Sequence, residues 1–290
     1  MPNFSSPSPA QLRAARWQRF LPRHLLTRCA GYLAAKQAGK MTTWAIRRFV
    51  NHYNVNMSEA QTPDITHYKT FNDFFGRALK PECRPFSQAT LISPVDGVIS
   101  QLGSIKENTI IQAKQHNYST HALLAGDTSL ANKFTDGQFA TIYLSPKDYH
   151  RIHMPCAGRL ISMHYVPGDL YSVNPATVIE IPGLFARNER VVCHFTSETL
   201  GDFVVVLVGA TIVGSMQTTW HGIVNQQQRQ QTFTRHYDAE TIDLKQGEEM
   251  GRFLLGSTVI MLFQQRQLAF QPTLAAGSPV KLGEAFANAI

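Results

Sequence analysis

Residues 253–263 read FLLGSTVIMLF, and residues 203–213 read FVVVLVGATIV. Both runs are almost continuously apolar and rich in Val, Ile and Phe, which favour strands. A strand that is apolar at successive positions is buried on both faces, whereas a half-exposed strand alternates with a period of two residues. The two runs therefore predict strands in the interior of a sheet.

Shorter strand-like runs, separated by Gly, Pro and Asn turns, surround these two from about residue 90 onward. They are 139–144 (FATIYL), 158–166 (GRLISMHYV) and 190–196 (RVVCHFT). This spacing of short strands and turns predicts a mainly antiparallel β sandwich or barrel-like core.

The chain before residue 90 has a helical pattern instead. We expect helices over 10–39, 42–53 and 71–79, after a Ser/Pro-rich tail and before a connector over 80–87 that contains two prolines. The predicted fold class is therefore α+β. The predicted division is a basic helical region at residues 1–70 and a β-rich domain at residues 71–290.

The composition is that of a globular protein, since 43% of its 290 residues are apolar and 16% are charged. No apolar run approaches the 18 residues of a membrane-spanning helix, and the N-terminus lacks the pattern of a secretory signal. We therefore expect a protein that stays in the cytoplasm. The four cysteines are far apart without a CxxC pair, which predicts free thiols.

The positive charge is concentrated at the N-terminus. Residues 1–58 hold nine of the 27 Lys and Arg residues and none of the 20 Asp and Glu residues. These basic residues are interleaved with Trp, Phe and Leu at near-helical spacing, which suits a helix lying on an anionic membrane. A nucleic-acid-binding helix, an organelle transit peptide and a solvated helix face are the alternatives that this pattern leaves open.

Gly256-Ser257-Thr258 lies within the first apolar run. A hydroxyl beside glycine is common in buried strands, and the ordinary interpretation is a structural serine whose hydroxyl is hydrogen-bonded. The alternative is that the Ser257 hydroxyl attacks the carbonyl carbon of Gly256, where no side chain obstructs the approach. That attack converts the amide to an ester, and β-elimination followed by hydrolysis would break the chain and leave a pyruvoyl group.

Residues 148–156 (DYHRIHMPC) and 93–99 (SPVDGVI) carry further candidates. His150 and His153 suit an acid or base role; on a helix they could share a metal, but no carboxylate ligand set accompanies them. Asp96 belongs to an Asp-Gly turn, or it orients a histidine as carboxylates do beside activated nucleophiles. Spacing alone does not bring Asp96, His153 and Ser257 together.

Seven segments taken together resemble the bacterial-type phosphatidylserine decarboxylases. They are FNDFFGRALKPECRPF (71–86), SPVDGVISQLG (93–103), YLSPKDYHRIHMPC (143–156), YVPGDLYSVN (165–174), LFARNERVV (184–192), VGATIVGS (208–215) and KQGEEMGRFLLGSTVI (245–260). They cover most of residues 70–260. The Leu-Gly-Ser-Thr string together with DYHRIHMPC is far more specific than either alone. Ala157 departs from the larger or polar residue often found there, while Gly158 is kept.

The resemblance implies a role for each candidate. Asp96, His153 and Ser257 would form a self-processing triad, with His153 as base and Asp96 as its orienter. Cleavage between residues 256 and 257 would leave a β chain (1–256) and an α chain (257–290) that begins with the pyruvoyl group, the covalent cofactor. His150 would serve decarboxylation, and Tyr143 and Ser172 would line the substrate pocket; no metal is implied.

The implied reaction decarboxylates phosphatidylserine to phosphatidylethanolamine and carbon dioxide through a Schiff base with the pyruvoyl group, an electron sink. The resemblance further implies a peripheral protein on the cytoplasmic face of the bacterial inner membrane and a homodimer of processed protomers, with no nucleic-acid partner. A serine hydrolase that uses Asp96, His153 and Ser257 without self-cleavage is one alternative, although no GxSxG elbow is present. A non-enzymatic basic protein that binds membranes or nucleic acid is the other.

Overall fold

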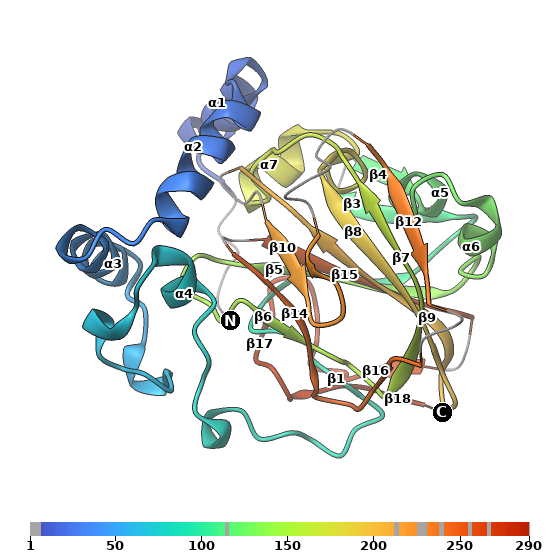
Figure 1. The fold of residues 1–290 in the computed structure, drawn as a ribbon. Coiled ribbons are helices and arrows are strands. Elements are labelled where there is room, and N and C mark those ends of the chain that lie inside the picture. Colours follow the sequence, from blue (N-terminus) through green and yellow to red (C-terminus); the bar gives the residue numbers. More distant parts are fainter. Residues whose placement is uncertain are drawn as a thin grey trace.

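The computed structural model describes residues 7–113, 116–211, 215–224, 231–237, 241–254, 257–265 and 268–289. Figure 1 shows the N-terminal helices on one side of the molecule and the sheets on the other. The predicted α+β class, with N-terminal helices and mainly antiparallel strands, is confirmed.

Short helices make up the N-terminal region. They are α1 (Pro9–Trp17), η1 (Gln18–Phe20), α2 (Arg23–Ala35), α3 (Lys40–Tyr53), η2 (Met57–Glu59), η3 (Ile65–His67), α4 (Phe71–Phe75) and η4 (Pro81–Cys83). The single helix predicted over 10–39 is wrong, because Leu21 is extended where it precedes Pro22. The helix predicted over 71–79 ends at Phe75, with Gly76 as its C-cap.

The largest sheet has nine strands and is antiparallel throughout its described pairs. Its order is β12 (Phe233–His236), β7 (Gly158–Val166), β8 (Arg190–Ser197), β9 (Gly201–Val208), β15 (Ser257–Phe263), β5 (Gln138–Leu144), β2 (Gly97–Ser104) and β17 (Pro279–Val280), with β13 (Asp243–Leu244) also on β7. Over these described strands the order runs from one edge to the other and does not close into a barrel.

Three smaller sheets and four short helices complete the described fold. The sheets are β11 (Gly222–Ile223), β10 (Met216–Thr218), β14 (Glu249–Phe253) and β6 (Arg151–His153); β1 (Leu91–Ile92), β18 (Ala285–Ala289) and β16 (Leu268–Phe270); and β3 (Thr109–Ala113) with β4 (His116–Ser119). The helices are α5 (Thr120–Leu123), α6 (Thr128–Asn132), α7 (Pro175–Glu180) and α8 (Leu184–Arg187).

Strand β15 lies at the centre of the hydrophobic core. It pairs with β9 on one side and β5 on the other, and all seven of its residues are buried. The single strand predicted over 253–263 is wrong, because the run is divided between two sheets: β14 ends at Phe253 in the four-stranded sheet, and β15 begins at Ser257 in the nine-stranded one. Phe253 and Ser257 therefore belong to different sheets, although only three residues separate them in sequence.

Two contact regions stand out among those that tie the N-terminal helices to one another and to the rest of the molecule. At the first, α1 and the turn after it reach α7 and its preceding loop, through an Arg16–Glu180 ion pair of 2.6 Å and a hydrogen bond of 3.0 Å from Gln18 to Thr177. At the second, α3 and α4 share a small apolar cluster that contains Ile46 and Phe75. This cluster is separate from the main core around β15.

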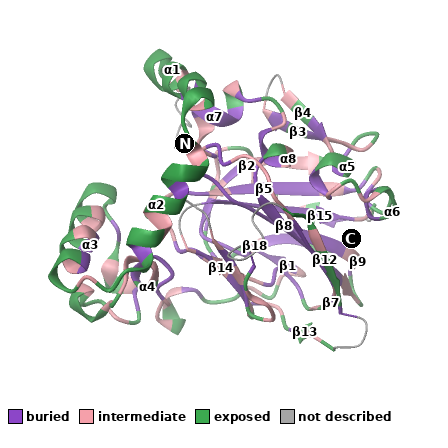
Figure 2. Ribbon diagram, turned by 45° about the horizontal axis from the view of Figure 1, so that its top comes forward, coloured by how far each residue is buried: buried purple, intermediate pink, exposed green. Residues whose placement is uncertain are grey.

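The outer faces of the N-terminal helices are largely exposed, as Figure 2 shows. Large apolar side chains stand among the exposed ones: Trp17, Phe20, Leu25, Tyr32, Leu33, Met41 and Trp44. Within the described residues, no helix has both the length and the apolar character needed to cross a bilayer. All four cysteines are free thiols, as predicted: Cys156 and Cys193 are buried, Cys83 is half-buried and Cys29 is exposed.

Candidate active site

Ser257 is the first residue of β15 and is fully buried. The register of the sheet places it opposite Leu144 on β5. Its Oγ has no hydrogen-bond partner within the described part of the chain. Burying a hydroxyl without a partner costs roughly 1–3 kcal/mol, so this position calls for an explanation. Gly256, on the other side of the expected cleavage point, lies outside the described residues.

His153 ends the short strand β6, beside the loop that carries Asp96. Its backbone N–H donates to the carbonyl of Pro94 at 2.9 Å. In the ring, Nδ1 lies 2.8 Å from the carbonyl oxygen of Gly247, and Nε2 lies 3.1 Å from Oη of Tyr149. Burial is the main reason that the pKa of His153 falls below its ordinary value. At neutral pH the ring is therefore an uncharged base.

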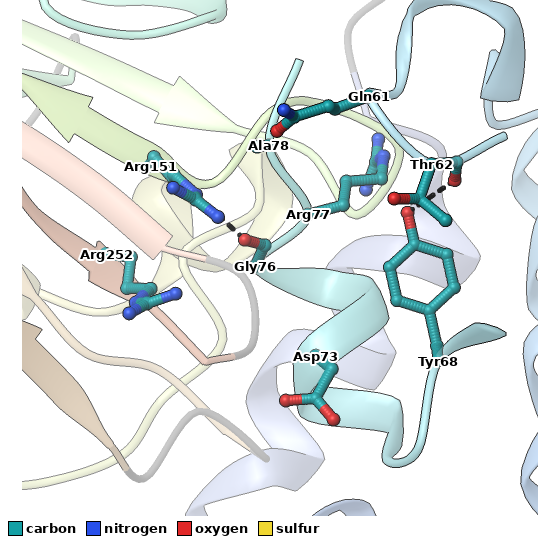
Figure 3. A pocket seen from close by; sticks show the side chains of 9 residues that line it. All are labelled: Gln61, Thr62, Tyr68, Asp73, Gly76, Arg77, Ala78, Arg151 and Arg252. Carbon is teal, nitrogen blue, oxygen red and sulfur yellow. Dashed lines mark hydrogen bonds between the residues drawn. The ribbon is translucent and has the colours of Figure 1, made fainter.

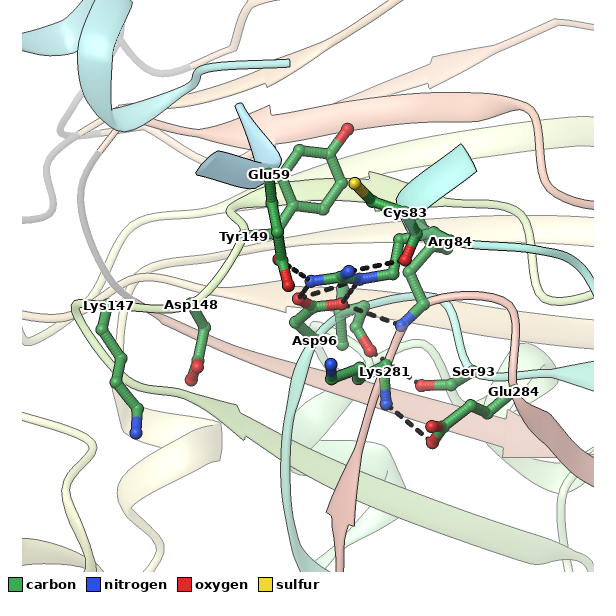
Figure 4. A network of polar contacts seen from close by, with 12 residues as sticks. Glu59, Cys83, Arg84, Ser93, Asp96, Lys147, Asp148, Tyr149, Lys281 and Glu284 are labelled. Carbon is green, nitrogen blue, oxygen red and sulfur yellow. Dashed lines mark hydrogen bonds and ion pairs between the residues drawn. The ribbon is translucent and has the colours of Figure 1, made fainter. Parts of the chain in front are cut away.

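The carboxylate of Asp96 is bound by Arg84. Arg84 Nε donates to Oδ1 at 2.9 Å, and the backbone N–H of Leu282 donates to the same oxygen at 2.9 Å. Arg84 also reaches Glu59 at 2.7 Å, so it bridges two carboxylates, as Figure 4 shows. The hydrogen bonds to Asp96 are the main reason that the pKa of Arg84 is raised. Within the described residues, the contacts of the Asp96 carboxylate do not include the ring of His153.

His150 lies just before β6 and is completely buried. Its Nδ1 is 2.9 Å from the carbonyl oxygen of Asp148, and its ring stacks at a tilt on Phe75, with 4.1 Å between centroids. Its Nε2 has no partner among the described residues. Burial lowers the pKa of His150 to about 3, so the ring is neutral and carries its lone pair on Nε2.

The backbone of His150 is also tied to the chain that leads to Ser257. Its carbonyl accepts a hydrogen bond of 3.0 Å from the N–H of Phe253, the last residue of β14. Leu254, the next residue, donates to the carbonyl of Ser215 at 3.1 Å. The first bond holds the end of β14 against His150, and the second ties Leu254, three residues before Ser257, to Ser215. The backbone therefore brings both candidate residues into one region of the structure.

Tyr143 and Ser172 lie in different surroundings. Tyr143 sits on β5 between Val98 and Thr258, and burial raises its pKa to about 12. It is thus beside the residue that follows Ser257. Ser172 lies in the loop before α7, where its N–H donates to Oε1 of Gln18 at 3.0 Å. Ser172 is therefore close to the N-terminal helices, and its role in a substrate pocket stays a prediction.

The metal-binding alternative for His150 and His153 depended on a helix. The structure has strand β6 at residues 151–153 instead, so the two rings do not share a helical face. No group of three potential ligands from His, Cys, Asp and Glu occurs within the described residues. The Nδ1 atoms of both histidines already face backbone carbonyls.

Two contributors to this site were not predicted from the sequence. Arg84 and Tyr149 both lie in segments that carry the family resemblance, yet neither was given a role. The signal for Arg84 is weak, because an arginine between Pro81 and Pro85 in a connector is ordinarily exposed; in the structure it is 8% exposed. Tyr149 stands next to His150 in sequence, but only the tertiary structure shows that its hydroxyl meets His153.

The chain is similar in sequence to known phosphatidylserine decarboxylases over most of its length. A model of the phosphatidylserine decarboxylase family matches residues 71–288, and a further model described as PSD matches residues 14–54. The phosphatidylserine decarboxylase proenzyme of Variovorax paradoxus is 62% identical over 93% of this chain and 95% of its own length. The proenzymes of Methylobacillus flagellatus and Chromobacterium violaceum are each 59% identical, over 95% and 93% of this chain and 98% and 97% of their own lengths.

Proposed function

The chain belongs to the phosphatidylserine decarboxylase family, and from that premise we propose how its residues process the chain and carry the reaction. The protein is a carboxy-lyase that converts phosphatidylserine to phosphatidylethanolamine and carbon dioxide. Because the chain belongs to this family, nothing supports the two alternative functions, a serine hydrolase and a non-enzymatic binding protein. The decarboxylating group, the processing residues and the membrane contact are our proposals.

Ser257 is the proposed source of a pyruvoyl group. The observation that carries this proposal is its buried Oγ without a described partner. Self-processing consumes that hydroxyl, because the oxygen departs with the carboxylate of residue 256, and the cost of an unpaired buried donor disappears with it. The surroundings of Ser257 therefore suit its conversion to a pyruvoyl group. Once formed, a pyruvoyl group supplies the electron sink for loss of carbon dioxide.

His153 is the proposed base for self-processing. Its Nε2 would accept the proton of the Ser257 hydroxyl as Oγ attacks the carbonyl carbon of Gly256. The carbonyl of Gly247 keeps the proton on Nδ1, which leaves the lone pair on Nε2. Asp96 would act on the processing site through its charge and through the loop that carries the Pro94 carbonyl, to which the backbone of His153 is bonded.

His150 is the proposed proton carrier of decarboxylation. Phosphatidylserine arrives with an ammonium group, which must lose a proton before its nitrogen can act as a nucleophile. Nε2 of His150 takes up this proton as the amine attacks, and the low pKa makes the protonated ring a strong acid that returns the proton to the α-carbon after carbon dioxide leaves. One further proton comes from solvent, because phosphatidylethanolamine leaves with its amine protonated again. We further propose that Tyr143 and Ser172 bind the substrate.

We propose that the N-terminal helices hold the enzyme on the cytoplasmic face of the bacterial inner membrane as a peripheral protein. The exposed apolar side chains of α1 to α3 and the acid-free, basic composition of residues 1–58 support this. We propose the division into residues 1–70 and 71–290 from the concentration of basic residues before residue 59; the apolar cluster shared by α3 and α4 packs the two parts together across that boundary. We also propose that the two larger sheets pack as a two-layer sandwich, because residues from both contribute to the main hydrophobic core. We further propose that two processed protomers form a homodimer.

The deciding experiment is an intact mass spectrum of the denatured wild-type protein beside Ser257→Ala. We expect two chains from the wild type, residues 1–256 and a fragment of residues 257–290 that begins with pyruvoyl, and one uncleaved chain from the variant. A single chain in both samples, prepared in the presence of membranes, would remove the pyruvoyl proposal. Decarboxylation of phosphatidylserine should be lost together with cleavage.

A further inference from the structure

A polar cavity lies on the side of the molecule where α4 meets the four-stranded sheet. It has a volume of about 260 Å³ and is lined by Arg77, Arg151 and Arg252, with Gly76, Tyr68 and Asp73 among its other walls. Figure 3 shows Arg151 and Arg252 on the sheet side and Tyr68 on the opposite side. None of the proposed catalytic residues lines it. It is therefore a separate site.

The lining carries more positive than negative charge. Three guanidinium groups stand against the single carboxylate of Asp73, which already accepts a hydrogen bond of 3.1 Å from the backbone of Thr70 at the start of α4. Arg151 forms an ion pair of 2.8 Å with Glu249 outside the lining. Arg252 donates from Nε to the amide oxygen of Gln217 at 3.1 Å, a neutral partner.

Arg77 is the residue that most requires a ligand. It is 4% exposed, and its Nη2 donates to the backbone carbonyl of Lys147 at 3.1 Å. Its Nε and Nη1 have no hydrogen-bond partner, and the guanidinium has no carboxylate partner, in the part of the chain that the structure describes. The ring of Phe74 lies 5.4 Å from its guanidinium carbon. The charges of Asp96, Asp148 and Glu59 act on this guanidinium from a distance, but burial outweighs them and lowers its pKa. A bound anion would offset the remaining cost of burial.

We propose that this cavity is a binding site for a phosphate group. Guanidinium groups are planar donors that match phosphate oxygens, and the three that line the cavity offer more donors than a carboxylate could accept. The volume suits a headgroup-sized anion and is below the range of sites for larger ligands. The phosphate can come from a phospholipid headgroup or from free inorganic phosphate.

The cavity is linked to the proposed active site through one short segment. Phe75 stacks on His150, and Arg77 follows two residues later. The charge of Arg77 contributes to the lowered pKa of His150, after the larger effect of burial. A bound anion would offset the Arg77 charge and raise the pKa of His150. The binding site itself does not depend on the proposed function.

The test is calorimetric titration of the complete protein in a phosphate-free buffer at fixed ionic strength. The probes are inorganic phosphate and glycerophosphoserine, with acetate as the carboxylate comparison. We expect saturable binding of at least one phosphate probe, little binding of acetate, and at least a tenfold loss of affinity in Arg77→Met. Tighter binding of glycerophosphoserine assigns the site to a lipid headgroup, and tighter binding of inorganic phosphate assigns it to the free ion.

Arg159→Met is the matched control, because it also removes one positive charge but breaks only an exposed ion pair with Asp243. Arg252→Met is the second test variant, since its half-buried side chain can be replaced if Arg77→Met does not fold. Absence of saturable phosphate binding, equal binding of acetate, or undiminished binding in the folded test variants would overturn the proposal. Binding is measured without catalysis, so failure of chain cleavage would leave this result intact.

Discussion

The hydroxyl of Tyr149 donates a hydrogen bond to Nε2 of His153, with 3.1 Å between the two atoms. The direction follows from the other side of the ring, where Nδ1 is 2.8 Å from the carbonyl of Gly247. A carbonyl oxygen can only accept, so Nδ1 carries the proton and Nε2 of the neutral ring carries the lone pair. The nitrogen proposed to act as the processing base is therefore occupied by Tyr149 before processing.

Tyr149→Phe should keep self-cleavage and shift its pH dependence. The phenyl ring preserves the packing, and Gly247 still fixes the tautomer. Because the tyrosine hydroxyl stabilises the neutral form of His153, its loss should raise the pKa of His153 and move the midpoint of cleavage to higher pH. Cleavage of freshly synthesised chains, followed by intact mass after a pH shift, measures this midpoint. An unchanged midpoint would show that Tyr149 does not act on His153.

His150→Ala should separate processing from decarboxylation. The variant removes Nε2, the proposed proton carrier, but leaves Ser257 and His153 in place. We expect chain cleavage to persist while decarboxylation falls by about 100-fold or more, the ordinary contribution of a positioned acid or base. The measurement compares the cleaved fraction with the release of carbon dioxide from phosphatidylserine. Equal loss of both activities would contradict the division of roles.

The buried neutral state of His150 should make the folded chain less stable in acid. Its pKa is about 3 in the folded protein, against an ordinary value of 6.5 for a solvated histidine. Below pH 6.5 the unfolded chain therefore binds a proton that the folded chain does not, and stability falls as the pH falls toward 3. The loss from this one group should reach about 2 kcal/mol at about pH 5. Burial lowers the pKa of His153 as well, which adds to the effect in the same direction.

Urea unfolding of the uncleaved Ser257→Ala chain at pH 7 and pH 5 measures this loss. His150→Asn in the same background is the matched variant, because it cannot take up the proton. We expect its stability to fall less between the two pH values. A pH dependence identical to that of the parent chain would mean that His150 does not titrate in this way.

Arg84→Met should destabilise the chain by about 3–5 kcal/mol, because it leaves the buried carboxylate of Asp96 without its main partner. We also expect slower self-cleavage, since Arg84 would no longer anchor Asp96 and, with it, the loop whose Pro94 carbonyl contacts His153. Urea unfolding in the Ser257→Ala background measures the first effect, and cleavage of the otherwise wild-type chain measures the second. Arg159→Met, which breaks an exposed ion pair, should cost less than about 1 kcal/mol. Equal costs for both variants would contradict the role of Arg84.

Replacing Trp17, Phe20 and Trp44 by Ser should weaken membrane binding without affecting the core. All three side chains are at least 65% exposed, so their loss should change the stability of the fold little. We expect a tenfold or greater fall in binding to vesicles of phosphatidylglycerol and phosphatidylcholine, measured by sedimentation. Vesicle binding equal to that of the wild type would place the membrane contact elsewhere.

Much of the fold could be predicted from the sequence. The strand predicted over 158–166 has the same bounds as β7, because local turn residues and apolar patterning define both ends. The helix over 10–39 and the strand over 253–263 were wrong for a shared reason. Each apolar pattern continues through a change of direction, at Pro22 and ahead of Ser257, and periodicity does not register such a change.

The site was less predictable than the fold. Asp96, His153 and Ser257 were selected from motifs, and the backbone places Asp96 and His153 in neighbouring segments through the Pro94 carbonyl. The partner of the Asp96 carboxylate could not be derived, because ion pairing depends on which side chains converge in space. Arg84 reaches it from a connector whose sequence gave no sign of burial.

Because β15 is central to the main sheet, cleavage of the chain before Ser257 should affect how the protein can refold. If the chain breaks before Ser257, the released piece still supplies the central strand of the main sheet, and its later strands β17 and β18 still pair with β2 and β1. The two pieces are then held together by strand pairing and by the shared core, with no peptide bond between them. An intact precursor can find its native state as a single chain, whereas two separated pieces must first meet in solution. Denaturation of the mature enzyme should thus be practically irreversible at low concentration, and each molecule is assembled only once.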